Sequence, residues 1–161
     1  MDGFHLYRAQ LDMMDDPKLA HRRRGAHWTF DGQGFVDLIE RIVREPGETM
    51  LAPTFDHAEK DPRPDDIAVR PEHCMVILEG LYLQLKSLSP WSKLPELVDE
   101  AWWIESRDLD AVKERLVVRY LEAGMTESRE KAIFRIDDSD RLNGTFILQN
   151  RISDPDYIIY N

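Results

Sequence analysis

The sequence has a single cysteine and no long apolar run, and each absence excludes a class of protein. Cys74 has no partner for an internal disulfide, which excludes a disulfide-rich secreted domain. We expect it to be a buried thiol in a reducing, cytoplasmic setting. The apolar run Met75–Leu78 is broken at once by Glu79, far short of the roughly 20 residues that span a bilayer. We therefore expect no membrane partner.

Positive charge is also scarce. The 31 acidic residues outnumber 21 basic ones and leave a formal net charge of −10, which repels phosphate backbones. We therefore expect no nucleic-acid partner. The one dense basic cluster is Arg22–Arg24. A cluster this short is more often a solvated turn than an anion-binding site, and both interpretations stay open.

Three kinds of catalytic motif are missing. No Gly-x-x-x-x-Gly-Lys-Ser/Thr or Gly-x-Gly-x-x-Gly loop occurs, so the chain shows no phosphate-binding loop. One cysteine and scattered histidines cannot form a structural zinc site. No serine lies in the sharp strand-to-helix turn of a hydrolase nucleophile.

The pattern of apolar residues predicts a single α/β domain with a mostly parallel sheet, because strand-like runs alternate with helical ones. Prolines in Asp61–Pro64 predict a loop, and the unbroken run Cys74–Leu78 predicts a strand buried on both faces. We expect helices at Gly34–Arg44, from the N-cap Asp108 to Glu122, from Thr126 to Ile133 and at Asn143–Asn150, and parallel strands at Thr49–Phe55, Met75–Leu78, Trp102–Ile104 and Tyr157–Tyr160.

Acidic residues stand where parallel sheets place their ligands, at the carboxyl ends of strands. Asp56 ends one predicted strand, Glu79 follows another, and Asp2 lies in Asp-Gly-Phe-His. A carboxylate at such an edge can orient magnesium, yet many strands end in an acid simply because the chain returns to solvent. Asp56–His57 could equally form a local turn.

Arg115 and Arg119 are four residues apart on one predicted helix, so both guanidinium groups project from the same face. They could bind a phosphoryl group, or they could form a salt-bridged surface with neighbours such as Glu114 and Glu122.

Taken in order, several segments resemble P-loop small-molecule kinases of the uridine kinase, phosphoribulokinase and pantothenate kinase type. The resemblance covers nearly all of the chain, and each motif is loose by itself. The segments are Met1–Leu6 (Met-Asp-Gly-Phe-His-Leu), Arg23–Ala26 with Trp28–Asp31, Pro53–His57 with Lys60–Pro62, Val76–Tyr82, Arg115–Arg119, and Ser139–Asp140 with Asn143.

The resemblance implies a P-loop NTPase kinase-type fold, three-layered with a mostly parallel sheet, that uses ATP and Mg²⁺ to phosphorylate a hydroxyl of a nucleoside, pantothenate or similar small molecule. It implies catalytic roles for Asp2, Glu79, Arg115 and Arg119, with Asp2 and Glu79 holding magnesium directly or through water. It implies an acceptor pocket at His5, Arg23, Arg24, Asp56 and His57, and nucleotide contacts at Asp140 and Asn143.

The resemblance also implies a departure from the family. Its first strand, phosphate-binding loop and first helix would all precede Asp2, so we expect residues 1–161 to form an incomplete P-loop kinase-like domain. Unpaired strand edges in such a domain would allow two copies to associate as a homodimer. The alternative to a kinase is a binding module of the same fold without turnover.

Overall fold

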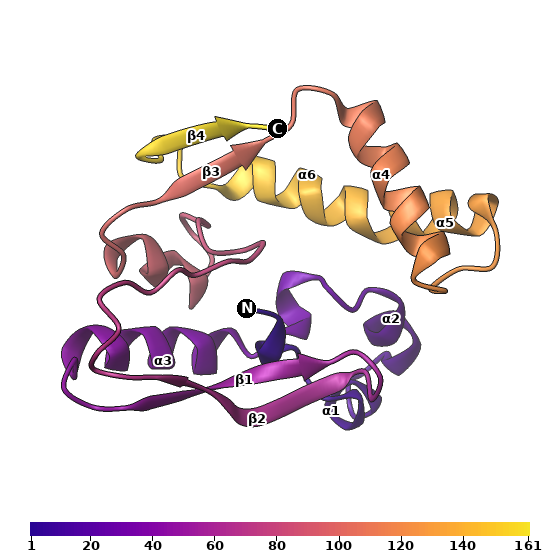
Figure 1. Cartoon of the computed structure of the whole chain (residues 1–161). Coiled ribbons are helices and arrows are strands. Elements are labelled where there is room, and N and C mark those ends of the chain that lie inside the picture. The colour runs from indigo at the N-terminus through magenta and orange to yellow at the C-terminus, as the bar shows by residue number, and fades with distance from the viewer. The chain divides into compact units, whose positions relative to one another are not determined.

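A computed structural model describes all 161 residues, which form two compact units (Figure 1). The first unit comprises Met1–Asp99 and Asn150–Ile152, and the second comprises Glu100–Gln149 and Ser153–Asn161. Both units combine helices with strands, which confirms the predicted α/β class. None of the helices has both the length and the apolar character needed to cross a bilayer.

The first unit begins with short helices and one long helix. Aspartates cap two of them, because the Asp16 side chain accepts the backbone N–H of Leu19 and Asp31 accepts that of Gly34. The second cap starts the predicted 34–44 helix at Gly32, two residues early. The elements are η1 (Asp2–Phe4), α1 (Arg8–Asp12), α2 (Pro17–Arg22), η2 (His27–Thr29) and α3 (Gly32–Arg44).

A two-stranded antiparallel hairpin follows α3. β1 (Met50–Asp56) pairs with β2 (Asp61–Val69), and the register shifts between Ala52 and Thr54. The predicted parallel pairing of the first strand is therefore wrong, and so is the predicted loop at 61–64. Prolines are tolerated in β2 because a two-stranded sheet consists only of edges, where a missing N–H leaves no interior ladder bond unmade.

The apolar run 74–78 forms no strand, contrary to prediction. Met75 and Ile77 are 77% and 82% exposed, and Cys74 is exposed as well. A strand is stable only beside another strand that takes its backbone hydrogen bonds, and no strand pairs with this segment. Apolar composition alone therefore does not bury this segment or its thiol.

The core of the first unit is a cluster of aromatic rings. Trp91, in η3 (Trp91–Glu96), lies 5.8 Å from Tyr82, 6.1 Å from Phe35 and 6.4 Å from Phe30 between ring centroids. All four side chains are buried. A Cβ at Gly32 would come within 2.8 Å of the Trp91 ring, so α3 approaches the cluster at a position that only glycine fills without a shift.

An arginine–aspartate pair ties the N-terminal segment to the hairpin. The Arg24 guanidinium donates to Asp61 Oδ1 at 2.9 Å and to the carbonyls of Leu6 and Lys60 at 2.7 and 2.6 Å. The backbone N–H of Arg8 donates to the same Oδ1 at 2.9 Å, and its Nε donates to Oδ2 at 3.3 Å. We call Arg24, Asp61 and Arg8 the clamp.

The clamp sets the ionisation of Asp61. Partial burial acts to raise the pKa of this carboxyl, but hydrogen bonds from Arg8 and Arg24 outweigh it and hold the pKa below its ordinary value. A carboxyl with a depressed pKa in the folded state contributes stability at neutral pH. That contribution is lost as the pH falls through the folded-state pKa.

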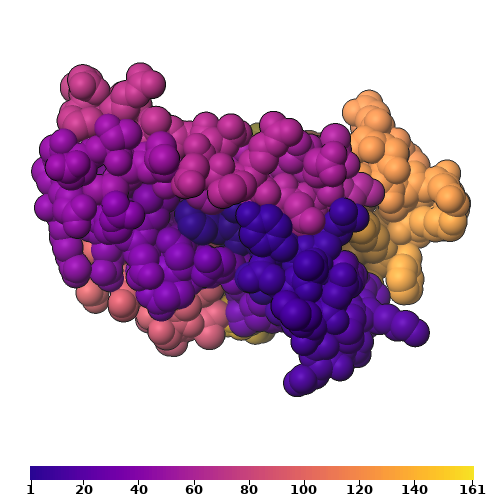
Figure 2. Space-filling model, turned by 90° about the horizontal axis from the view of Figure 1, so that it is seen from below, coloured from indigo at the N-terminus to yellow at the C-terminus, as the bar shows by residue number.

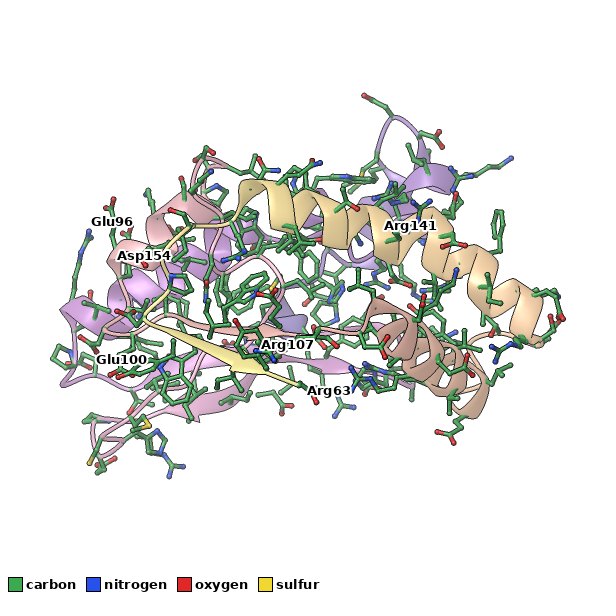
Figure 3. The ribbon with its side chains drawn as sticks, turned by 90° about the horizontal axis from the view of Figure 1, so that it is seen from above. Arg63, Glu96, Glu100, Arg107, Arg141 and Asp154 are labelled. Atoms are coloured by element: carbon green, nitrogen blue, oxygen red, sulfur yellow. The ribbon has the colours of Figure 1, made fainter.

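The second unit contains a parallel strand pair and three α-helices. β3 (Trp102–Glu105) pairs with β4 (Tyr157–Tyr160), as predicted for these two strands. Figure 3 shows Arg107 beside β4, where its guanidinium lies 3.9 Å from the Tyr160 ring centroid. The helical elements are α4 (Leu109–Glu122), α5 (Arg129–Arg135), the π-helical turn η4 (Ile136–Asp140) and α6 (Arg141–Asn150).

The helices of the second unit pack around a small core. Val117, Tyr120, Ala132 and Ile136 are buried together. Two polar contacts reinforce this packing: Arg129 donates twice to the Glu114 carboxylate, at 2.7 and 2.5 Å, and the Tyr120 hydroxyl donates to Asp140 at 2.6 Å. The helices predicted over 108–122 and 143–150 are thus confirmed, with Asp108 as the cap of α4.

We predict that Asp61→Asn destabilises the first unit by about 1–3 kcal/mol at pH 7, because the amide keeps the shape of the clamp but loses both charge-assisted pairs. The difference from the unmodified chain should be smaller at pH 3 than at pH 7, because protonation of this carboxyl in the unfolded chain already removes part of its contribution there. Urea unfolding at the two pH values measures this. Asp15→Asn, at an exposed position, should change stability by less than about 0.5 kcal/mol. An equal loss at both pH values would contradict the charged clamp.

We predict that Tyr120→Phe destabilises the second unit by about 1–2 kcal/mol, because Asp140 loses a hydroxyl donor in a largely buried setting. Burial and the bond to Asp140 also raise the pKa of the Tyr120 hydroxyl, which keeps the donor protonated. Thermal unfolding followed by circular dichroism is the measurement. The matched control is Tyr157→Phe, at a side chain 53% exposed, which should leave the midpoint nearly unchanged. Equal shifts for both variants would refute the role of this hydrogen bond.

Candidate functional site

A hollow lies in the first unit between its N-terminal residues and the β1–β2 hairpin. Three prolines of the hairpin, Pro53, Pro62 and Pro64, form part of its wall. Its polar lining consists of His5, Tyr7, Gln10, Asp31 and Asp65. Figure 2 shows the indigo N-terminal residues seated against the magenta residues of the hairpin.

A glycine brings the N-terminal residues to this position. A Cβ at Gly3 would come within 2.1 Å of the Pro53 carbonyl oxygen, a distance that no side chain tolerates. Because Gly3 lies flat on β1, Asp2 and His5 on either side of it are held at the hairpin. The glycine of the Asp-Gly-Phe-His motif is therefore required sterically, because no larger residue fits against Pro53.

His5 is held as a neutral imidazole. Its Nδ1 lies 2.8 Å from the Asp2 carbonyl oxygen, and a carbonyl only accepts, so Nδ1 carries the proton and Nε2 presents a lone pair. The ring packs on Phe30 and Phe55 at centroid distances of 4.1 and 5.0 Å. Desolvation lowers the pKa of His5 below its ordinary value, against the opposing effect of Asp2, so the ring stays neutral at pH 7.

The backbone next to Asp2 is hydrogen-bonded to the backbone of Glu79. The amino nitrogen of Met1 donates to the Glu79 carbonyl oxygen at 2.7 Å, so the two acidic residues stand next to the two ends of one hydrogen bond. Both side chains are exposed. Protein sites for Mg²⁺ commonly use one or two carboxylates together with water and substrate phosphates. This pair of carboxylates fits such a site by its chemistry.

The predicted acceptor residue Arg24 uses its guanidinium inside the clamp, so its terminal N–H groups bond to the protein itself. The Cζ atom of Arg24 also lies 5.4 Å from the centroid of the Phe55 ring. Arg23, beside it, is partly exposed. Arg24 thus holds the residues that form the hollow.

Asp56 and His57 form the turn that was the alternative interpretation. Asp56 Oδ1 accepts the backbone N–H groups of Glu59 and Ala58, at 3.1 and 2.8 Å, while Oδ2 pairs with Arg63 at 2.9 Å. These bonds, that from Glu59 foremost, lower the pKa of the Asp56 carboxyl. His57 is exposed next to it. Asp56 therefore closes the hairpin.

Arg115 and Arg119 lie in the second unit on an exposed face of α4. Both line a shallow hollow along the helix, with Glu122 and Val118 beside them. Neither arginine forms a salt bridge: of the two expected partners, Glu114 pairs with Arg129 instead, and Glu122 lines the same hollow without an ion pair. Their shared face agrees with the predicted spacing, and their charges are available to an anion.

The two predicted nucleotide contacts also lie in the second unit. Asp140, at the end of η4, accepts the Tyr120 hydroxyl, and Asn143 is buried in α6. π-Helical turns such as η4 are rare and often occur at functional sites. Both side chains are therefore part of the packing of this unit.

Sequence reasoning missed four residues of the hollow: Tyr7, Gln10, Asp31 and Asp65. Asp31 carried a visible signal, since it precedes Gly34 by three residues as helix caps do. Asp65 carried none, because its position depends on β2, which the two prolines concealed.

Two of three comparisons with known proteins find relatives of this chain. A scan against models of known protein families finds no match. The chain is 45% identical over 155 residues to the ATP-dependent kinase-like protein notR' of Aspergillus versicolor, covering 94% of this chain and 89% of the relative. It is 37% identical to a protein of Schizosaccharomyces pombe named as a candidate uridine kinase, covering 99% of this chain and 66% of that protein.

A solved structure is similar over the whole chain. It is YFH7 from Saccharomyces cerevisiae, described as a candidate P-loop kinase with a circular permutation. The TM-score is 0.87 at 31% sequence identity, over 100% of this chain. The chain spans only 56% of that structure, so it corresponds to about half of this relative. Together these similarities, above all the 45% identity along nearly the full length of notR', show that the chain belongs to the P-loop kinase family.

Proposed function

We propose that this chain contributes the acceptor site and the phosphoryl-neutralising arginines of a kinase that transfers the terminal phosphoryl group of ATP to a hydroxyl of a small molecule. The observation that carries the proposal is the contact of Gly3 with Pro53 of β1, which places His5 in the lining of the hollow and Asp2 directly before the lining residue Gly3. The names of the relatives support ATP as the donor.

The acceptor hydroxyl would bind in the hollow within reach of Asp2. In this role the Asp2 carboxylate accepts the hydroxyl proton as the oxygen attacks phosphorus. Neutral His5, with its Nε2 lone pair, would accept a hydrogen bond from a second hydroxyl and orient the acceptor.

Asp2 and Glu79 would hold the magnesium ion, directly or through water. Bound there, Mg²⁺ would neutralise charge on the phosphates of ATP. These two residues are the part of the site that this chain supplies, and the phosphates themselves would complete the coordination.

Arg115 and Arg119 would bind the phosphoryl group in transfer. Neither is neutralised by a carboxylate in the structure, and both project from one face of α4. Positive charges placed where negative charge grows supply much of the catalysis in phosphoryl transfer. The name of the S. pombe relative favours a nucleoside as the acceptor.

We predict that the 161-residue chain by itself binds ATP weakly, with a Kd above about 1 mM. Its sequence contains no glycine-rich loop whose amides and lysine would hold the phosphates. Titration calorimetry with ATP and Mg²⁺ measures this. Tight, magnesium-dependent binding would contradict the proposal, because it would require a different nucleotide pocket.

We predict that Asp2→Asn lowers phosphoryl transfer by about 10²–10⁴-fold in a protein that carries this chain together with a phosphate-binding loop. Nucleotide affinity should fall far less than turnover, because Glu79 and the phosphates would keep most of the magnesium ligands while the hydroxyl loses its proton acceptor. Steady-state kinetics and calorimetry give the two readouts. Asp15→Asn, an equal change of charge at another exposed site of the first unit, should leave turnover intact. Unchanged turnover in Asp2→Asn would remove Asp2 from the mechanism.

A further inference from the structure

The charges around the hollow of the first unit restrict what it can bind. We propose that this hollow takes an uncharged polyhydroxyl compound, either a free sugar or the ribose of a nucleoside, and rejects compounds that carry phosphate or carboxylate groups. The inference deepens the proposed function, because the bound compound would be the phosphoryl acceptor.

The lining of the hollow is anionic. Asp31 and Asp65 contribute carboxylates, and no lysine or arginine lines it. The arginines that contact this part of the unit, Arg8 and Arg24, share the carboxylate of Asp61 in the clamp. An anionic ligand would therefore meet two negative charges with no dedicated positive partner, and such contacts are unfavourable at close range.

The hydrogen-bonding groups of the hollow are mostly acceptors. Neutral His5 offers Nε2, and Asp31 retains Oδ2 because only its Oδ1 caps α3. Asp65 adds a carboxylate. There are two exceptions: Gln10, whose Oε1 accepts the N–H of Tyr7 and whose amide NH₂ is left as a donor, and Tyr7, whose hydroxyl can donate as well as accept. A set rich in acceptors selects ligands rich in donors, and hydroxyl groups are the uncharged donors of sugars.

The hollow is also small. Its volume is about 200 Å³, below the roughly 300–1,000 Å³ of sites for drug-sized ligands. It suits one sugar ring, whose carbon atoms would contact Phe4 and the hairpin prolines that line it. For a nucleoside, the ribose would occupy the hollow and the base would extend beyond it.

Asp65 provides a clean substitution for the test. Its φ is +53°, in the left-handed region that asparagine adopts more readily than most residues. Asp65→Asn therefore removes a negative charge from the hollow while it keeps the side-chain shape and the backbone conformation.

The experiment measures binding to the intact chain in the absence of ATP, by titration of backbone amide NMR shifts. The uncharged probes are D-ribose and uridine; the anionic probes are ribose 5-phosphate and pantothenate. We expect both uncharged probes to shift amides of the hollow and to bind at least about tenfold more tightly than the anions. If uridine binds more tightly than ribose, the ligand of the hollow is a nucleoside. If the two bind equally, the ligand is a free sugar.

Two variants and one control sharpen the test. Asp65→Asn should reduce the preference for ribose over ribose 5-phosphate about threefold or more, whereas Asp15→Asn, outside the hollow, should not. His5→Phe keeps a ring against Phe30 and Phe55 but loses the acceptor, so uncharged probes should bind at least about tenfold more weakly. The amide spectrum of each variant reports whether it is folded.

For the unmodified chain, raising the salt concentration gives an independent test, since it should weaken the rejection of the anionic probes.

The outcomes separate this inference from the proposed function. Anions binding as tightly as sugars, or no probe shifting the amides of the hollow, would overturn the inference. Binding of sugars without phosphoryl transfer in a protein that has a phosphate-binding loop would instead contradict the proposed kinase activity. Transfer to an anionic acceptor would support the kinase and overturn the choice of acceptor.

Discussion

The first unit depends on one charged contact, in which the Asp61 carboxylate accepts hydrogen bonds from Arg24 and from Arg8. Through this contact and two backbone carbonyls, the N-terminal segment, the turn after α2 and the start of β2 are held together. A partly buried carboxylate is costly unless it is paired, and here hydrogen bonds from two arginines stabilise it. The hollow exists because these three segments are held in place.

The clamp also explains why the candidate acceptor site is anionic. Its two arginines, Arg8 and Arg24, both pair with Asp61 and do not line the hollow. The charged groups of the lining are therefore the carboxylates of Asp31 and Asp65, beside the neutral imidazole of His5. In the second unit the arginines that line the shallow hollow along α4 have no salt bridge, since Glu114 pairs with Arg129 and leaves Arg115 and Arg119 unpaired. The groups offered to a ligand therefore differ between the units. In the first they are mostly hydrogen-bond acceptors, and in the second they include two guanidinium groups, with Glu122 beside them.

Two errors in the sequence-based prediction have the same physical origin. Apolar composition made residues 74–78 look like a buried strand, and two prolines made residues 61–64 look like a loop, yet the first segment is unpaired and the second is part of β2. Strand formation depends on whether a neighbouring backbone offers hydrogen bonds, and a local window of sequence does not contain that neighbour. The long helices α3, α4 and α6 were predicted well because caps such as Asp108 and the helical apolar spacing are local, whereas the helix predicted from Thr126 to Ile133 spans Arg129–Arg135, after its cap Ser128.

The sequence by itself determined the α/β class, the long helices, the shared face of Arg115 and Arg119, and the family, since the ordered motifs run along most of the chain. It also predicted roles for Asp2 and His5, but not that Gly3 between them lies against the Pro53 carbonyl oxygen, where a side chain would not fit. Only the tertiary structure decided that Arg24 serves the clamp, that Asp56 closes a turn, and that Asp31 and Asp65 line the hollow with His5. The physical reason is distance along the chain, since Arg24 and Asp61 are 37 residues apart. Whether each charged side chain pairs with another residue or faces solvent depends on which segments the fold brings together.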